Sequence, residues 1–301
     1  MTPGFNSHQP VLCSEFLDLI NIKPCGTYVD CTFGRGGHSN LILQQLNPQG
    51  KLFAFDRDPS AFLYGKKTLG HDLRFKIINS EFSKINSFLG DFQDKIDGIF
   101  VDLGISSPQV DNPSRGFSFS GDGPLDMRMN PTHGMSAGEW LRSAPEKVIA
   151  DVIWRYGEER NSRRIAREIV KRREQERLNT TSDLAATTLY SRRKNSRTHS
   201  ATKTFQAIRI FINDEMTELN SVLEEAVKMV AIGGKIVVIS FHSLEDRLVK
   251  RKFRDLSKGK PNKTERYFSL VTKKPIMASR EEISSNKRSR SARMRVLERL
   301  S

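Results

Sequence analysis

The sequence predicts an α/β protein built on a doubly wound parallel sheet, into which a second, mainly helical domain is inserted. Residues 27–102 alternate short apolar runs with helical stretches, which is typical of a parallel sheet with right-handed crossovers. The alternation stops after residue 102, and residues 136–191 then show helical periodicity without a clear strand. Another apolar run at 235–240 resumes the α/β pattern, so the sheet-forming sequence is discontinuous.

Short apolar runs mark the strands, and helical stretches lie between them. The strands expected before the insertion are residues 27–31, 51–56, 75–78 and 97–102. A helix is expected at 39–46, where apolar residues recur on one face. Pro59 suits the first turn of the next helix, because its missing N–H has no partner in that turn anyway.

The insertion is expected to begin as a loop and to continue as helices. Its expected segments are a loop at 106–130, helices over 136–191 and a basic loop at 192–203. After these we expect one long helix over 205–231, a stop at Gly233-Gly234 and a strand at 235–240. Residues 257–263 and 279–292 are basic and polar and are expected to be mobile. The chain is therefore divided into residues 1–105, 106–205 and 206–301.

The charge is large and unevenly distributed. The 301 residues carry 49 Lys and Arg against 35 Asp and Glu, a net charge of +14. The whole excess lies after residue 150, in the later part of the insertion and in the C-terminal part: residues 1–150 have a net charge of −2 and residues 151–301 of +16. This distribution favours a polyanionic partner, most simply a nucleic acid. A soluble protein with a high pI is the alternative, and an anionic membrane surface fits less well because no amphipathic anchor accompanies the basic stretches.

Composition excludes several classes of protein. Hydrophobic residues make up 37% of the chain, which is enough for a folded core. No apolar run is long enough to span a membrane, and the first residues lack the pattern of a secretory signal. Three irregularly spaced cysteines suit neither a disulfide framework nor a zinc site. We therefore expect a cytoplasmic protein without a bound metal.

A cofactor site is expected where the first strand enters its helix. Asp30 ends that strand and is followed by a glycine-rich turn through Gly36 and Gly37. Asp56 ends the second strand, where a carboxylate can accept hydrogen bonds from the ribose hydroxyls of an adenosine. The turn is not G-x-G-x-x-G, so a pyrophosphate is not favoured, whereas S-adenosylmethionine lacks phosphates altogether. An ordinary strand-to-helix turn is the alternative interpretation.

A second candidate is Asp102, at the end of the fourth strand. Its carboxylate would lie beside a methyl donor and could accept a hydrogen bond from an amino group of the acceptor. The alternative is that Asp102 only caps the following turn. The next residues, Leu103-Gly104-Ile105, depart from the Asp-Pro-Pro-Tyr motif of many amino-methyltransferases.

Long motifs in a fixed order carry a resemblance to a known family. They are HQPVL at 8–12, the segment 30–39, FDRDP at 55–59, DLGISSPQ at 102–109, RGFSF at 115–119, GPLDMRM at 123–129, YGEER at 156–160, TFQAIR at 204–209 and SFHSLEDR at 240–247. With these motifs the sequence resembles the RsmH (MraW) family of bacterial ribosomal small-subunit methyltransferases over nearly its whole length. Cys31 stands where relatives often have Gly, and residues 257–279 are less recognisable.

The resemblance implies a class I S-adenosylmethionine-dependent methyltransferase. It implies methylation of the N4 amine of a cytidine in the decoding region of 16S rRNA, and it implies 16S rRNA within the small ribosomal subunit as the partner. It implies cofactor contacts at Gly36, Gly37, His38, Asp56, Phe82, Asp102 and Gln109, and the position of Asp102 beside the methyl donor makes it the expected catalytic residue. Residues 1–105 and 206–301 would form the methyltransferase core, and residues 106–205 would recognise the substrate. A homodimer is compatible with the sequence.

Substrate contacts are expected in loops and basic segments. By resemblance, Asp126 and Arg128 would line the acceptor pocket. His242 would contact substrate or, alternatively, begin a helix as its cap. Phe82 would flank the adenine ring or simply pack in the core. The candidates for phosphate contacts are Arg192, Arg193 and Lys194 in the basic loop, together with residues 287–295.

Charged residues 158–164 are expected to pair along a helix surface, for example Glu159 with Arg163.

Two other functions stay open at this point. A nicotinamide oxidoreductase would need the pyrophosphate turn that the glycine spacing lacks. A non-catalytic RNA-binding assembly factor would not need the polar residues Asp56, Asp102 and Gln109.

Overall fold

The computed structural model describes residues 10–189, 199–258 and 266–301. The chain divides into two compact units, one of residues 1–104 and 217–301 and the other of residues 105–216. The first unit holds the sheet, and the second is mainly helical. The division that we expected after residue 205 falls inside helix α10 (Thr202–Ile212), because this helix packs against α7 (Glu146–Gly157) of the second unit.

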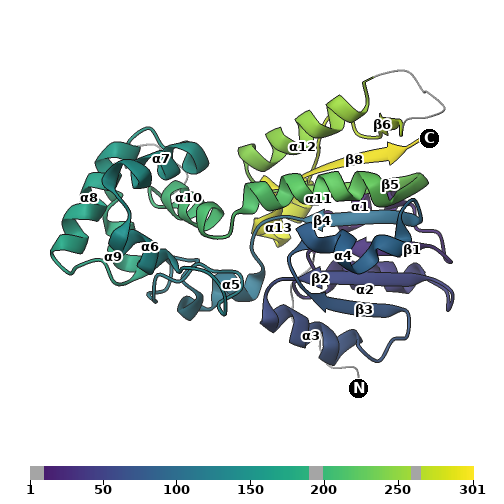
Figure 1. Ribbon diagram of the computed structural model, residues 1–301, viewed down its shortest axis with the longest axis horizontal. Helices are drawn as coiled ribbons and strands as arrows, with labels where there is room; N and C mark the ends of the chain where they lie inside the picture. Colours follow the sequence, from purple (N-terminus) through teal and green to yellow (C-terminus); the bar gives the residue numbers. More distant parts are fainter. Residues whose placement is uncertain (1–9, 190–198, 259–265) are drawn as a thin grey trace. The chain divides into compact units, whose positions relative to one another are not determined.

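A sheet of eight strands in the described residues forms the frame of the first unit (Figure 1). Its parallel strands are, in spatial order, β3 (Phe75–Asn79), β2 (Lys51–Asp56), β1 (Thr27–Asp30), β4 (Ile96–Asp102) and β5 (Val230–Ser240). Strand β8 (Arg293–Arg299) pairs with β5 antiparallel, and β6 (Phe268–Leu270) and β7 (Ile276–Met277) pair with β8. The order reverses between β1 and β4, which is the switch point of a doubly wound sheet. The predicted α/β fold class is confirmed.

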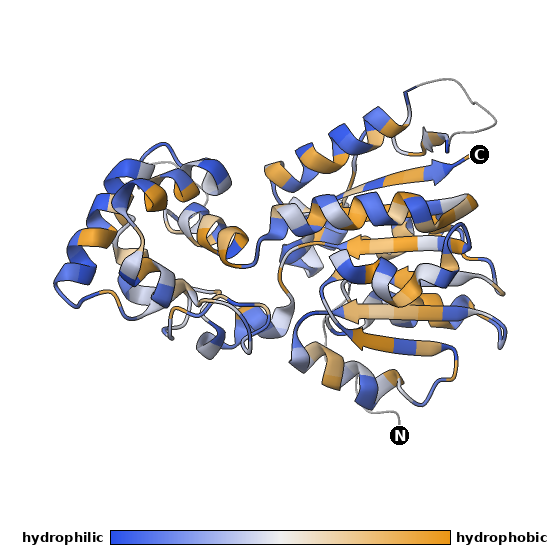
Figure 2. Ribbon diagram, in the orientation of Figure 1, coloured by the Kyte–Doolittle hydropathy of each residue, from blue (hydrophilic) through white to orange (hydrophobic). Residues whose placement is uncertain are grey.

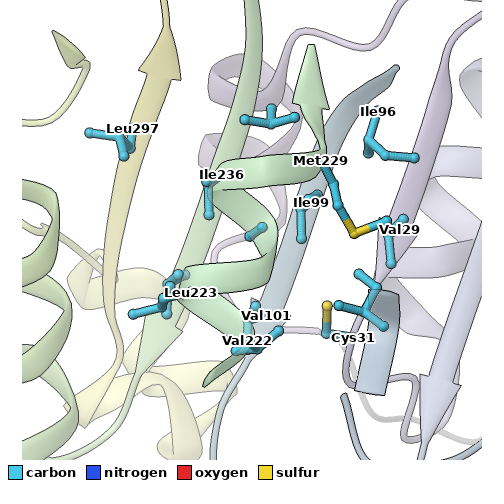
Figure 3. Packing of buried hydrophobic residues seen from close by; sticks show 14 of the residues in the cluster. Val29, Cys31, Ile96, Ile99, Val101, Val222, Leu223, Met229, Ile236 and Leu297 are labelled. Atoms are coloured by element: carbon cyan, nitrogen blue, oxygen red, sulfur yellow. The ribbon is translucent and has the colours of Figure 1, made fainter. Parts of the chain in front are cut away.

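Helices cover both faces of this sheet. One face carries α1 (Cys13–Ile20), α2 (Gly37–Gln45) and α3 (Pro59–Leu69). The other carries α4 (Ile85–Leu89), α11 (Glu215–Met229) and α12 (Ser243–Leu256). Strands β1 and β4 are mostly buried, as expected for central parallel strands, and β4 carries a hydrophobic run at 99–101 (Figure 2). Val222, Leu223 and Met229 of α11 pack against them, and each fully buried side chain of this kind contributes about 1.5–3 kcal/mol (Figure 3).

Local sequence explains how the helices near the strand ends begin. Asp58 caps α3 by accepting a hydrogen bond from the backbone N–H of Ser60, and Pro59 is the first helical residue, as predicted. Two short 3₁₀ segments, η1 (Phe82–Lys84) and η2 (Gly90–Phe92), flank α4. These elements place the carboxyl ends of β1, β2 and β4 along one edge of the sheet.

The glycine pair Gly233-Gly234 does not stop an element, contrary to our prediction. Both glycines lie inside β5, where the pairing with β4 shifts register between Ile96 and Gly98. Gly233 has φ +74°, and a Cβ on Gly234 would lie 2.8 Å from the carbonyl oxygen of Ile96. The pair therefore makes an irregularity within the strand that a residue with a Cβ could not adopt easily.

Residues 279–292 form regular structure, contrary to the expectation of a mobile segment. Ser279 is the N-cap of helix α13 (Arg280–Ser285), and its hydroxyl accepts a hydrogen bond from the N–H of Glu282. A 3₁₀ segment, η5 (Lys287–Ser291), follows. The Glu282 carboxylate in turn accepts a 2.8 Å hydrogen bond from the N–H of Leu12. This long-range contact fixes the helix. Most of the other segment, 257–263, lies outside the described residues.

The second unit is built from short helices around a core of its own. Its described helices are α5 (Ser107–Asp111), η3 (Pro113–Arg115), α6 (Ala137–Ser143), α7, α8 (Ser162–Glu174), α9 (Thr181–Ala186) and α10. Trp140, Ile153, Ile165, Phe205 and Ile208 are among its buried side chains. The first two elements lie in the segment 106–130 that we expected to be loop, and the prediction of helices over 136–191 is confirmed as far as residue 189.

The predicted long helix over 205–231 is two helices, α10 and α11, with a break at Asn213-Asp214. Asp214 has φ +49°, and Asn213 is buried. The Asn213 side chain accepts from the N–H of Met129 and donates to the carbonyl of Met127, both at 2.7 Å. The helix ends because this amide bonds a distant loop, which helical periodicity does not reveal. Among the described residues, no helix is long and apolar enough to cross a membrane.

Candidate active site

Three aspartates end three neighbouring parallel strands. Asp30 ends β1, Asp56 ends β2 and Asp102 ends β4. Because β1 lies between the other two, the three side chains share the edge at which open α/β sheets bind their ligands. The structure thus brings together the two strand-end aspartates that the sequence predicted as site residues, and it adds Asp30 between them.

Asp30 holds the turn that follows β1. It is buried, and its two oxygens accept hydrogen bonds from the N–H of Thr32 at 3.0 Å and from the hydroxyl of Ser39 at 2.7 Å. Burial raises the pKa of this carboxyl to about 6, although both hydrogen bonds act in the opposite direction. Sequence reasoning placed Asp30 at the strand end but missed this role, since its partner Ser39 becomes visible only once α2 is folded.

The glycine-rich turn uses backbone angles with positive φ, which glycine adopts easily. Gly34 has φ +55° and Gly36 has φ +72°, and Gly36 is the N-cap of α2. A Cβ on Gly37 would lie 2.4 Å from the Pro10 ring. Cys31, just before the turn, is buried in the core, where burial raises its thiol pKa well above the usual value (Figure 3). Its small side chain therefore serves packing.

Asp56 connects the end of β2 to this turn. One carboxylate oxygen accepts from the N–H of Gly34 and the other from the N–H of Asp58, both at 2.8 Å. Burial, with smaller contributions from Asp58 and Asp30, raises its pKa to about 6. Each carboxylate oxygen can accept more than one hydrogen bond, so Asp56 retains acceptor capacity for a ligand's hydroxyl groups.

His38 lies at the start of α2 with a buried ring. Its Nε2 is 3.0 Å from the carbonyl oxygen of Val11, and because a carbonyl can only accept, Nε2 carries the hydrogen. Burial lowers the His38 pKa to about 4, so the ring is neutral at pH 7 and Nδ1 presents a lone pair. Nδ1 faces Asp102 Oδ2 at 3.7 Å, which is too far for a hydrogen bond.

Asp102 has an acceptor without a donor. Its Oδ1 is buried and has no hydrogen-bond partner anywhere in the described residues. Burial, and then the charges of Asp30 and Glu245, raise the Asp102 pKa well above its usual range. The backbone N–H of Asp102 donates to Thr32 Oγ1 at 2.7 Å, which links the ends of β4 and β1. Within the described chain no hydrogen bond runs from its carboxylate to the following backbone, so the structure does not support the capping alternative.

The remaining predicted cofactor residues lie in different surroundings. Phe82, in η1 after β3, is partly buried and packs against the core of the first unit. Gln109 belongs to the second unit, where it is buried in α5. Its side-chain oxygen accepts from the N–H of Ser106 at 2.9 Å and so completes a capping box.

Asp126 and Arg128 form a bidentate ion pair in the second unit. Arg128 Nε lies 2.8 Å from Asp126 Oδ1, and its NH2 lies 2.9 Å from Oδ2. Arg128 also donates to the carbonyl of Gly134. The pair fixes the loop that carries it, and both side chains retain partial exposure.

His242 caps α12, as one of our two interpretations stated. Its Nδ1 accepts from the N–H of Glu245 at 3.3 Å, while Glu245 Oε2 accepts from the N–H of His242. His242 Nε2 lies 3.0 Å from Glu245 Oε1, but the two atoms lack hydrogen-bond geometry. The cap accounts for Nδ1, whereas Nε2 is buried without a hydrogen-bond partner among the described residues, and the substrate contact stays a prediction.

The two basic segments differ in what the structure describes of them. Arg192, Arg193 and Lys194 lie outside the described residues. In the other segment, Arg295 is buried and its Nε lies 2.7 Å from Asp246 Oδ1. Arg293 NH1 lies 3.2 Å from Asp246 Oδ2. Both arginines therefore connect β8 to α12. For buried Arg295 this corrects the prediction of a phosphate contact, whereas Arg293 keeps a side chain that is 42% exposed.

Comparison with known proteins finds one methylase family and relatives of one name over nearly the whole chain. The model of the MraW methylase family matches residues 6–300. A ribosomal RNA small subunit methyltransferase H from Hydrogenovibrio crunogenus is 48% identical over 308 residues, covering 99% of this chain and 98% of that protein. Proteins of the same name from Nitrosococcus oceani and Coxiella burnetii are 47% and 45% identical, over 98% of this chain and 97% and 99% of theirs.

Proposed function

This chain belongs to the MraW methylase family, and from that premise we propose that it transfers a methyl group from S-adenosylmethionine to the N4 amine of a cytidine in the decoding region of 16S rRNA. The observation that carries this proposal is the buried Oδ1 of Asp102, an acceptor without a donor at the switch point of the sheet. An unpaired buried acceptor is costly, and an amine N–H of the substrate would satisfy it.

The residues at this edge fit S-adenosylmethionine. Asp56 keeps acceptor capacity for ribose hydroxyls, and the Gly36-Gly37 turn lies between the ends of β1 and α2 without side chains of its own. Phe82 follows the neighbouring strand β3 and offers an aromatic surface for the adenine. When bound, this cofactor supplies an electrophilic methyl group on a sulfonium.

Asp102 would act on the acceptor amine. The lone pair of a cytosine amine is delocalised into the ring, so a carboxylate that accepts one N–H helps to localise that lone pair on nitrogen. The same hydrogen bond would hold the nitrogen in line with the methyl group, at about 3–3.5 Å. As the N–C bond forms, the amine becomes acidic and its proton can pass to Asp102, whose raised pKa suits it to receive a proton.

His38 would leave the Asp102 carboxylate free to accept a hydrogen bond from the substrate amine. Its Nε2–H is committed to Val11, so it cannot donate a hydrogen bond to Asp102 from Nδ1. The Asp102 carboxylate therefore stays available for the substrate. The cofactor contact expected at His38 stays a prediction beside this role, and the structure shows its ring buried against Val11.

The second unit is assigned to recognition of the RNA. In this unit Asp126 and Arg128 are partly exposed, and Gln109 lies in α5, seven residues after Asp102 in the sequence. The target base must be unpaired or extruded to enter a pocket of this kind. The basic loop with Arg192, Arg193 and Lys194 would contact phosphates. Within the same proposal the protein acts in the cytoplasm on the small ribosomal subunit.

Incubation with labelled S-adenosylmethionine and either small ribosomal subunits, free rRNA or DNA tests the function. We expect label in rRNA as N4-methylcytidine, and replacement of Asp102 by Ala should abolish it. Because Asp102 can also hold the cofactor, binding of S-adenosylmethionine must be measured separately. Wild-type turnover in the variant at saturating cofactor would refute the role of Asp102. Binding of NAD without S-adenosylmethionine would favour an oxidoreductase instead, and RNA binding without methylation would favour an assembly factor.

A further inference from the structure

The exposed face of α8 carries a row of cations. Ser162, Ile165, Ala166 and Ile169 bury the other face in the second unit. Arg163, Arg167 and Lys171 are all exposed and recur every four residues, so they lie along one side of the helix. At 1.5 Å per residue, successive cations are about 6 Å apart and the row spans about 12 Å. We call these three residues the α8 row.

Two acids close to the α8 row in the sequence, Glu159 and Glu168, contact other groups. Glu159, the predicted partner of Arg163, instead accepts a 2.9 Å hydrogen bond from the backbone N–H of Asn161. Glu168 pairs with Arg172, with Nε and Oε1 3.0 Å apart. Within the described ranges, neither Arg163 nor Lys171 has an acidic partner within 4.0 Å. The predicted pairing of Glu159 with Arg163 is therefore wrong.

Arg167 is only weakly paired. Its Nε lies 3.9 Å from Glu146 Oε1, and the side chains are 76% and 44% exposed. Exposed ion pairs of this length are worth little, because water and salt screen them. Binding an anion would therefore cost little free energy at any of the three residues, because no strong ion pair has to be broken.

The row does not stabilise α8. Like charges four residues apart destabilise a helix by about 0.2–0.5 kcal/mol per pair, and the row contains two such pairs. Arg163 also lies in the first turn, which holds no acidic residue, so its charge opposes the helix dipole. Lys171 lies in the last turn, where a cation suits the helix dipole, but a surface selected only for helix stability would not place cations at Arg163 and Arg167 as well. The charges therefore need an explanation outside the helix.

We propose that the α8 row binds the phosphate backbone of the RNA substrate, an inference that rests on the proposed function. Arginine presents a planar set of donors that matches phosphate oxygens, and the regular spacing suits a chain of phosphates. A membrane surface fits less well, since no large apolar side chain on the described α8 is exposed. The row thus adds a third recognition segment to the basic loop and the acceptor pocket.

The experiment compares two double variants of the full-length protein. Arg163→Gln with Lys171→Gln removes two cations from the row and keeps good helix formers there. Lys67→Gln with Lys76→Gln is the matched control, because it removes two exposed cations that have no partners among the described residues and lie in the first unit. Each protein is titrated with transcribed small-subunit rRNA at several salt concentrations, and S-adenosylmethionine binding and thermal unfolding are measured in parallel.

Losing two phosphate contacts should reduce the salt slope, d log K/d log [salt], by about 1.4 for a single strand. That slope corresponds to roughly 25-fold weaker RNA binding at about 0.1 M salt, with the difference vanishing towards 1 M. Cofactor affinity should not change, and unfolding should not shift to lower temperature, because two like-charge pairs are relieved. The control should keep the wild-type slope.

Equal salt slopes for the two double variants would overturn the assignment of the row. A row variant that loses binding to vesicles of anionic lipid but keeps its affinity for rRNA would overturn it as well. If the wild-type protein itself neither binds nor methylates rRNA, the proposed function fails and the row proposal fails with it. If wild type methylates rRNA and only the contrast between variants is missing, the row proposal alone fails.

Discussion

Replacing Asp30 by Asn should stabilise the protein at neutral pH. The carboxyl is buried, and its pKa is about 6 in the folded protein against the usual value of 3.8. Each unit corresponds to 1.36 kcal/mol, so keeping this group charged in the fold costs about 3 kcal/mol at pH 7. An asparagine can keep both contacts, with its oxygen accepting from Thr32 and its NH₂ donating to the Ser39 hydroxyl.

The sign of the pH dependence follows from the direction of the shift. Between the unfolded and folded pKa values, the folded state binds more protons, so wild-type stability falls as pH rises from about 4 to beyond 6. The variant lacks this titration. The free-energy difference should therefore be small near pH 4 and reach about 3 kcal/mol at pH 7, roughly 6–12 °C in Tm for a unit of this size.

Denaturant unfolding of both proteins across pH 4–8 measures this difference. The other titrating carboxyls are the same in wild type and variant, so their contributions to the pH dependence largely cancel when the two are subtracted. A difference that does not change with pH, or a wild type that is more stable at pH 7, would refute the reasoning. The same variant has a functional consequence, because the Asp30 charge contributes to the raised pKa of Asp102. The acid limb of the methyl-transfer rate should move to lower pH in the variant.

Three further predictions follow from other contacts. Asp246→Asn should destabilise by about 3–5 kcal/mol at neutral pH, because it leaves the buried guanidinium of Arg295 unpaired; urea unfolding measures this, and an unchanged midpoint would contradict it. The net effect of burial and of the two arginines lowers the Asp246 pKa, so its contribution is lost as pH falls, opposite in sign to Asp30. Asn213→Ala should cost about 1–3 kcal/mol and increase hydrogen exchange at Met129, since that N–H loses its partner; wild-type protection there would count against the break as described. Neutralising the three cations at 192–194 should weaken RNA binding and flatten its salt slope while cofactor affinity stays unchanged, and an unchanged slope would remove that loop from the RNA surface.

The sequence predicted the sheet well because buried parallel strands are apolar on both faces. The runs that end at Asp30, Asp56 and Asp102 carry this signal directly, and parallel pairing then brings their carboxyl ends together. The position of each strand-end aspartate was therefore predictable from local sequence alone. What each carboxylate contacts was not, since Ser39, Gly34 and His38 reach them only after α2 has packed.

The errors share a physical cause. The glycine pair in β5 indicates a stop by itself, but its close approach to the Ile96 carbonyl is a property of the neighbouring strand. The break at Asn213 depends on a loop more than eighty residues away in sequence. Arg295 belongs to a basic run and is nevertheless buried, because Asp246 on α12 lies opposite β8. Local charge and periodicity do not contain these long-range partners.

The central claim is that Asp102 acts on the acceptor amine. It is tested most directly by single-turnover methyl transfer to small ribosomal subunits, with wild type and Asp102→Asn compared at saturating S-adenosylmethionine and the modified nucleoside identified. Asparagine is close in size and keeps the backbone contact to Thr32, but it cannot take a proton. We predict N4-methylcytidine with wild type and none with the variant, although the variant binds cofactor and RNA. Transfer by the variant at the wild-type rate, or a methyl group on a different atom, would contradict this role.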